Sequence, residues 1–109
     1  MSTEFENFLD VYGISFESLS AVHGVEITED NAYQVLTNDE SIQNLKEAVE
    51  EETDYDILEN YGTFEVRSTL IQNDVVEGET EDDAFFAFLN YVKCTYGDIL
   101  LDTVYDNLL

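Results

Sequence analysis

The stretch TEDDAFFAFLNYVKCTYG, from Thr80 to Gly97, carries the strongest helical pattern in the chain. Thr80 and Asp83 suit the start of a helix, where side-chain oxygens cap free N–H groups and acids favour the helix dipole. Phe86 and Tyr91 lie off the main apolar face, so we expect a helix over 81–96 that is buried on more than one side. That main face recurs at three- and four-residue spacing and consists of Phe85, Phe88, Leu89, Val92 and Tyr96.

Weaker helical patterns lie on either side of this segment. The one that follows Thr53 and Asp54 has Ile57, Leu58 and Tyr61 on one face, with a glycine next to end it. Similar apolar spacing and capping residues recur along the rest of the chain. We expect these helices over residues 3–12, 15–23, 29–36, from 38 or 39 to about 52, 53–61 and 98–108.

The hydrophobic period changes after Gly62. Between Thr63 and Ile71, apolar residues alternate with polar ones, which is typical of a strand. We expect a turn at Asn73-Asp74 and a short return strand over residues 75–77. The sequence therefore predicts a single α+β domain over residues 1–109, mostly α, with about six short helices and one β-hairpin near residues 63–77.

The charge of the chain is extreme. Its 109 residues include 26 acids against three basic side chains, which gives a net charge of −23 and a pI near 4.1. Seven Phe and seven Tyr, with 44% hydrophobic residues, indicate a folded core rather than acidic disorder. Such a surface lacks the cations that bind nucleic acid and is repelled by anionic membranes. Its natural partner is a basic protein.

Few residues offer chemistry. The lone cysteine, Cys94, excludes an internal disulfide and is expected to be a thiol of the core or its boundary. His23 is expected to lie at a helix end in a structural role. The stretch from Asp54 begins like a calcium-binding loop but soon departs from that pattern. We therefore expect no catalytic residue, no metal site and no cofactor, and we interpret the chain as a protein without enzymatic activity.

Carboxylates fall in rows at helical-neighbour spacing. Glu47, Glu50, Glu51 and Asp54 would share one face, with neighbours about 5–6 Å apart. Asp98, Asp102 and Asp106 would form a second row. Further clusters lie at 56–59 and 79–83. The predicted partner-binding carboxylates are Glu47, Glu50, Glu51, Asp54, Asp56, Glu59, Glu79, Glu81, Asp82, Asp83, Asp98, Asp102 and Asp106.

The charge density is close to that of DNA. Duplex DNA carries one negative charge per about 1.7 Å of its axis, so 23 charges occupy roughly 39 Å of duplex. A compact chain of this size has a similar diameter, roughly 34 Å. In size, charge and aromatic-rich composition the chain resembles the small acidic DNA-mimic inhibitors of phages and mobile elements, which include anti-restriction and anti-CRISPR proteins. No motif of a particular family accompanies this resemblance, so no functional residue is carried over from it.

The resemblance implies a protein that occludes the DNA-binding groove of a basic protein, of which a defence nuclease of the restriction or CRISPR type is our first expectation. An immunity protein or antitoxin that neutralises a basic toxin nuclease is the main alternative, and a small domain of a halophile is the second. A monomer and a homodimer that extends the charge track are both compatible with the sequence. The N-terminal residues MSTEFENFLD lack the features of a signal peptide, and no apolar run is long enough to span a membrane. We therefore expect a cytoplasmic protein, in the host cytoplasm if a phage encodes it.

Overall fold

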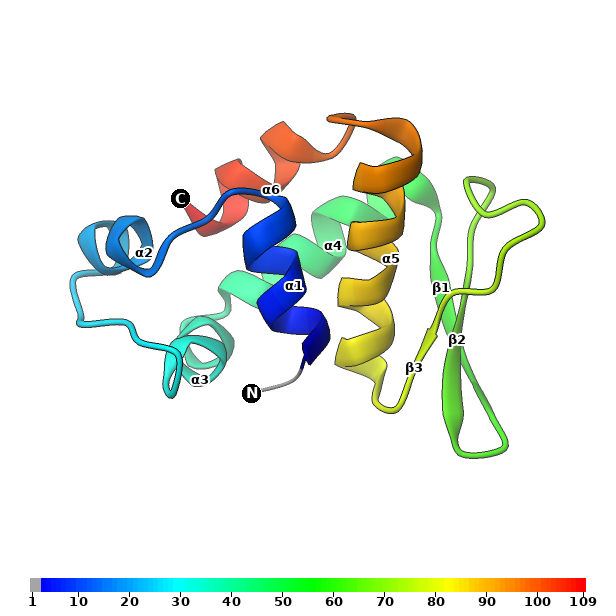
Figure 1. The fold of residues 1–109 in the computed structure, drawn as a ribbon, viewed down its shortest axis with the longest axis horizontal. Coiled ribbons are helices and arrows are strands. Elements are labelled where there is room, and N and C mark those ends of the chain that lie inside the picture. Colours follow the sequence, from blue (N-terminus) through cyan, green and yellow to red (C-terminus); the bar gives the residue numbers. More distant parts are fainter. Residues whose placement is uncertain (1–2) are drawn as a thin grey trace.

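The computed structural model describes residues 3–109, and helix α5 (Glu81–Tyr96) lies at its centre. Figure 1 shows α5 between helix α1 (Thr3–Val11) on one side and the sheet on the other. Phe86 faces α1, with its ring centroid 5.1 Å from that of Phe5 and 5.0 Å from that of Phe8. Phe85 faces another side of the helix and packs against Tyr55, with ring centroids 5.5 Å apart. The prediction that this helix is buried on more than one side is confirmed.

Long-range hydrogen bonds hold α1 against α5 and the end of the chain. The buried Tyr12 hydroxyl donates to the Leu89 carbonyl oxygen at 2.7 Å, and burial raises the pKa of this phenol. The Tyr105 hydroxyl donates to the Tyr12 carbonyl oxygen, also at 2.7 Å. These bonds satisfy polar groups that the aromatic core would otherwise leave unpaired.

The remaining helices are short, and several begin later than their sequence pattern suggests. Asn31 accepts a hydrogen bond from the Thr28 amide at 2.8 Å, which forms a turn where a helix start at residue 29 was expected. Glu40 adopts a left-handed conformation with φ of 67°, and Asp39 accepts from the Ser41 amide. The other helices are α2 (Phe16–His23), α3 (Ala32–Asn38), α4 (Ser41–Thr53) and α6 (Leu101–Leu108).

The helix expected over 53–61 is wrong, because this segment forms a strand. Asp54 takes a left-handed conformation that ends α4, and β1 (Asp56–Asn60) then pairs antiparallel with β2 (Thr63–Arg67). The strand places Ile57 opposite Val66, which is buried against the core. The few apolar residues of this segment fit the spacing of a helix as well as that of a strand. Their cross-strand contacts with β2 favour the strand.

The predicted hairpin near 63–77 is confirmed as an antiparallel pair, although its connection differs. β3 (Glu77–Gly78) pairs with β2, with Gly78 opposite Phe64 and Glu77 opposite Glu65, so the sheet has the order β1-β2-β3. Residues 68–76 form a loop instead of a tight turn and a longer strand. The Tyr96 hydroxyl donates to the Leu70 carbonyl oxygen at 2.7 Å and fastens this loop to α5.

The whole is the expected α+β domain, mostly helical, with one small antiparallel sheet. Its principal extents are 40 × 29 × 20 Å, with a radius of gyration of 13.4 Å. Among residues 3–109, no helix combines the length and the apolar character needed to cross a bilayer.

Candidate functional site

Four exposed acids gather along α4 and its C-terminal end. Glu47, Glu50, Glu51 and Asp54 together line a shallow, open depression of about 450 Å³. The opposite face of the helix buries Leu45 and other apolar residues in the core, so the acids point to solvent. The structure thus brings together the first carboxylate row expected from the sequence. We call these four residues the α4 acidic row.

The second expected row is only partly formed. α6 begins at Leu101, so Asp98 lies in the preceding turn and forms an ion pair with Lys93. Asp102 and Asp106 are exposed on α6, which packs beside α4. The expectation that all three residues share one helix is therefore wrong.

Asp56 and Glu59 do not continue the helical row, because they belong to β1. Alternation along the strand puts them on opposite faces, with Asp56 opposite Arg67 and Glu59 opposite Phe64. The outer face of the sheet also carries Glu65, which binds Arg67 at 3.2 Å.

The acids at the start of α5 divide into two groups. Glu79 and Asp83 line an open depression of about 660 Å³ together with Glu4 and Glu77, two acids that the sequence did not single out. Glu81 is exposed nearby. The sequence missed Glu4 and Glu77 because they reach this place through the packing of α1 and β3 around α5, for which no local pattern exists.

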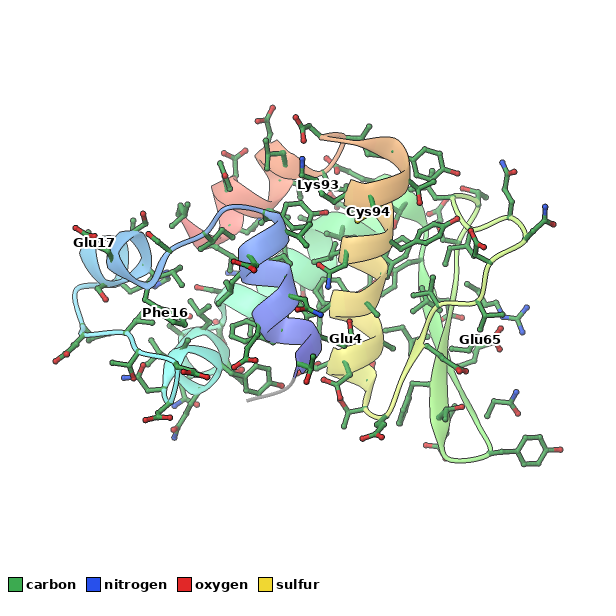
Figure 2. The ribbon with its side chains drawn as sticks, viewed as in Figure 1. Glu4, Phe16, Glu17, Glu65, Lys93 and Cys94 are labelled. Atoms are coloured by element: carbon green, nitrogen blue, oxygen red, sulfur yellow. The ribbon has the colours of Figure 1, made fainter. Side chains whose placement is uncertain are left out.

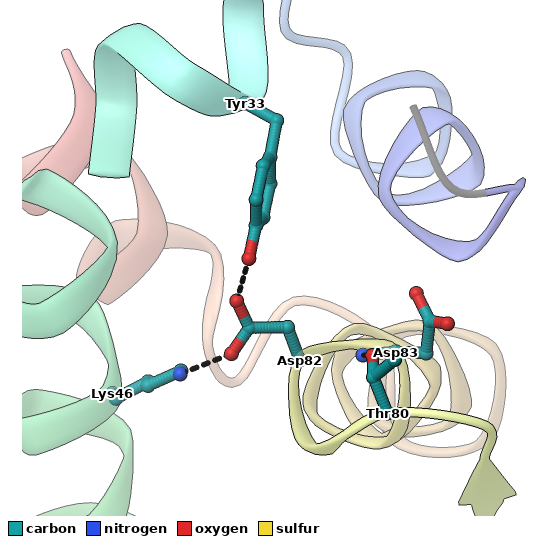
Figure 3. A network of polar contacts seen from close by, with 5 residues as sticks. All are labelled: Tyr33, Lys46, Thr80, Asp82 and Asp83. Carbon is teal, nitrogen blue, oxygen red and sulfur yellow. Dashed lines mark hydrogen bonds and ion pairs between the residues drawn. The ribbon is translucent and has the colours of Figure 1, made fainter. Parts of the chain in front are cut away.

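Asp82 is only partly exposed, in contrast to Glu79 and Glu81. Figure 3 shows its carboxylate between the hydroxyl of Tyr33 and the ammonium group of Lys46, both of which donate to it. Burial raises the pKa of Asp82, with the negative Asp83 as a second cause, and burial lowers the pKa of Lys46. This pair joins α4 to α5, so we remove Asp82 from the partner-binding set.

All three basic side chains of the chain are paired with acids. The partners of Lys46, Arg67 and Lys93 are Asp82, Glu65 and Asp98, which all lie outside the α4 acidic row. Within residues 3–109, no lysine or arginine lines the depression on α4. Figure 2 shows that acidic side chains also occupy distant parts of the surface, such as Glu17 on α2 and Glu65 on β2.

The two residues considered for chemistry have different surroundings. His23 is nearly buried, and its ring nitrogens contact the Leu108 carbonyl oxygen at 2.9 Å and the Asp39 carboxylate at 2.8 Å. Cys94 is exposed on α5, so the expectation of a core or boundary thiol is wrong. The part of the chain that the structure describes has no group of three or more His, Cys, Asp or Glu placed to hold a metal ion.

Comparison with known proteins adds no assignment. The chain matches no protein-family model, and it has no significant match among curated proteins or solved structures.

Proposed function

We propose that this protein is a DNA mimic that occludes the nucleic-acid-binding groove of a basic DNA-binding protein. The observation that carries the proposal is the α4 acidic row. Its four exposed carboxylates line a depression to which none of residues 3–109 contributes a basic side chain. Like charges at helical-neighbour spacing destabilise a folded chain by a few tenths of a kcal/mol per pair. A basic partner would relieve this repulsion.

The dimensions support the comparison with a duplex. The long axis of the molecule is 40 Å, and 23 charges correspond to about 39 Å of duplex DNA. A protein that reads mainly phosphate positions would therefore meet a similar charge per length on either ligand. Asp102 and Asp106 on the neighbouring α6 add to the negative potential near the row.

The mechanism is competitive occlusion without catalysis. Carboxylates take the places of phosphates against lysine and arginine side chains of the groove, and the high net charge accelerates the encounter. The proposal needs no cofactor or metal. A defence nuclease of the restriction or CRISPR type is the target class that we propose, which places the action in the cytoplasm where such a nuclease works.

Capture and competition test this function. The immobilised protein is exposed to a host lysate at low salt, and the bound proteins are eluted either with duplex DNA or with high salt. We expect a basic protein to be released by duplex DNA and to lose its own DNA binding when the acidic protein is added. Capture should weaken steeply with salt, because salt screens charge-dominated association. A captured protein that duplex DNA does not displace would instead support an immunity protein.

Neutralisation of the α4 acidic row identifies the interface. The variant Glu47→Gln, Glu50→Gln, Glu51→Gln and Asp54→Asn removes four charges with little change of shape, and asparagine tolerates the left-handed backbone at residue 54. We expect the affinity for the captured protein to fall by about tenfold or more, measured by calorimetry at one fixed salt concentration.

The matched control removes four charges from exposed sites elsewhere. Its changes are Asp10→Asn, Glu17→Gln, Glu26→Gln and Asp30→Asn. We expect the control to retain most of the affinity. Equal losses in the two variants would show that net charge alone drives binding and that the α4 acidic row has no special part.

A further inference from the structure

The turn between β1 and β2 presents an aromatic ring entirely to solvent. Tyr61 is 101% exposed, and it occupies a left-handed conformation with φ of 54°, followed by Gly62 with φ of 85°. Thr63 donates its hydroxyl to the Asn60 carbonyl oxygen at 2.9 Å across this turn. Figure 1 shows the turn at one extremity of the molecule, away from the helices.

The fold does not require a tyrosine at this position. A left-handed residue of a two-residue hairpin turn favours asparagine, aspartate or glycine, because a Cβ atom and a large side chain are disfavoured there. The fully exposed ring also contributes no burial to the core. Tyr61 therefore carries a local conformational cost that its packing does not offset, and such residues often belong to functional sites.

The surroundings of the ring define what can bind it. The hairpin and its neighbouring strand carry the acids Asp56, Glu59, Glu65 and Glu77, while Leu58 is 47% exposed on β1. The face of an aromatic ring attracts cations, and a negative field around it strengthens that attraction. Nucleic acid and anionic lipid are repelled by the same field, and a second copy of this chain would bring a further charge of −23.

We propose that Tyr61 is the aromatic anchor of the interface, and that its ring docks against arginine or lysine side chains of a basic protein partner. The partner class rests on the proposed function, whereas the docking of cationic side chains on the hairpin can be tested without the target. Buried aromatic anchors next to a polar rim are a common source of binding energy in protein interfaces. The α4 acidic row would then contribute mainly charge, and the hairpin would contribute contact specificity.

Two substitutions of Tyr61 distinguish the contribution of its ring from that of the left-handed backbone. Tyr61→Ala removes the ring but keeps a Cβ atom in the same left-handed conformation, so we expect an unchanged melting temperature. Tyr61→Phe keeps the ring and removes only the hydroxyl. Ile99→Ala is the matched control, because Ile99 is another exposed apolar side chain (53%) and lies in the α5–α6 turn, distant from the hairpin in Figure 1.

The first measurement uses a nona-arginine peptide and the isotope-labelled protein at about 0.15 M salt, where surface charge effects are partly screened. In NMR spectra recorded as the peptide is added, we expect the backbone amide signals of residues 60–63 to shift until they reach a plateau, both in the wild type and in Tyr61→Phe. In Tyr61→Ala these shifts should be largely lost, and in Ile99→Ala they should persist. Shifts confined to the α4 acidic row, or equal behaviour of Tyr61→Ala and Ile99→Ala, would overturn the proposal.

The second measurement uses the purified protein that duplex DNA releases from the affinity column. We expect Tyr61→Ala to weaken its binding by at least about tenfold, as for other aromatic anchors, and Tyr61→Phe to change it little. If this target is bound and Tyr61→Ala leaves the affinity intact, the anchor is disproved and the proposed function stands. If the peptide docks at residues 60–63 but no protein is displaced by duplex DNA, the proposed function fails and the cation-binding hairpin remains.

Discussion

His23 connects three parts of the chain through its two ring nitrogens. It extends from the end of α2 to the Asp39 carboxylate before α4 and to the Leu108 carbonyl oxygen at the end of α6. Both partners accept hydrogen bonds, so only the doubly protonated imidazolium donates to both at once. Burial alone would raise the pKa of Asp39, but hydrogen bonds from Ser41 and the nearby His23 lower it below its ordinary value.

We predict that His23→Ala lowers the free energy of unfolding by about 1–2 kcal/mol, because it removes the contacts of the ring nitrogens with the Asp39 carboxylate and the Leu108 carbonyl oxygen from a nearly buried site. Urea denaturation followed by circular dichroism measures the change. His23→Gln, which can still donate one hydrogen bond, should lose less. An unchanged midpoint for His23→Ala would show that water replaces these contacts at no cost.

For single residues, the sequence predicts the position in a helix better than it predicts the contacts that the side chain makes in the fold. The structural position of His23 at a helix end follows from the neighbouring glycine, but its two acceptors do not. Likewise, the acids at the start of α5 look alike in the sequence. Asp82 differs from them only because Lys46 and Tyr33, which lie 36 and 49 residues away, meet it in the fold.

At the scale of single elements, the strength of the local signal decided which predictions succeeded. α5 has the predicted bounds, 81–96, because a cap, an acidic first turn and four turns of apolar spacing agree. Thr80 indeed accepts from the Asp83 amide at 3.0 Å. The segment 53–61 has four apolar residues, at positions 55, 57, 58 and 61, whose spacing fits a helix or a strand, so its pairing with β2 decided its structure. Three members of the α4 acidic row, Glu47, Glu50 and Glu51, were predictable because helical spacing is a local property. Asp54 joins them from the left-handed residue that ends the helix.

The junction between β3 and α5 depends on the absence of a side chain at Gly78. A Cβ atom there would lie 2.4 Å from the Ala84 backbone nitrogen and 2.7 Å from the Asp83 carbonyl carbon. Both neighbours belong to the backbone of the first turn of α5, which is fixed by the Thr80 cap. The strand and the helix can approach closely only because this residue is glycine.

We predict that Gly78→Ala lowers the free energy of unfolding by about 1–3 kcal/mol, since the backbone must shift to accept one methyl group. Thermal melting measures the loss. Glu79→Ala, at the exposed neighbouring position, is the control and should change stability by less than about 0.5 kcal/mol. Equal stability of Gly78→Ala and the wild type would mean that β3 moves away from α5 without cost.

For the whole molecule, charge repulsion makes stability depend on pH. A hydrogen bond with Glu6, and the negative charge of Glu6, raise the pKa of Glu29, and burial raises the pKa of Asp82. The folded state therefore binds protons at these groups at a higher pH than the unfolded chain does. This difference favours folding as the pH falls through the raised pKa values toward the ordinary values of 4.5 and 3.8.

We predict that the free energy of unfolding rises as the pH falls from 7 toward the ordinary pKa values of Glu29 and Asp82, the reverse of the usual loss in acid. Below pH 4 the lowered pKa of Asp39 acts in the opposite direction, because the folded state then loses a favourable charge. Urea titrations at several pH values, at constant ionic strength, measure this curve. The variant Glu29→Gln should have a shallower rise, and a steady fall in stability from pH 7 downward would contradict the prediction.

The docking of α1 on α5 also has a consequence for synthesis of the chain. The Tyr12 hydroxyl finds its acceptor on Leu89, a residue 77 positions later. At about 5–20 residues per second, the ribosome needs roughly 4–15 s to add that segment. During this interval Phe86 of α5 is missing from the contacts of Phe5 and Phe8, although Tyr33 of α3 is already available to Phe5. Helix α1 is therefore made long before the helix that covers most of it, and this part of the core closes only after α5 has been made.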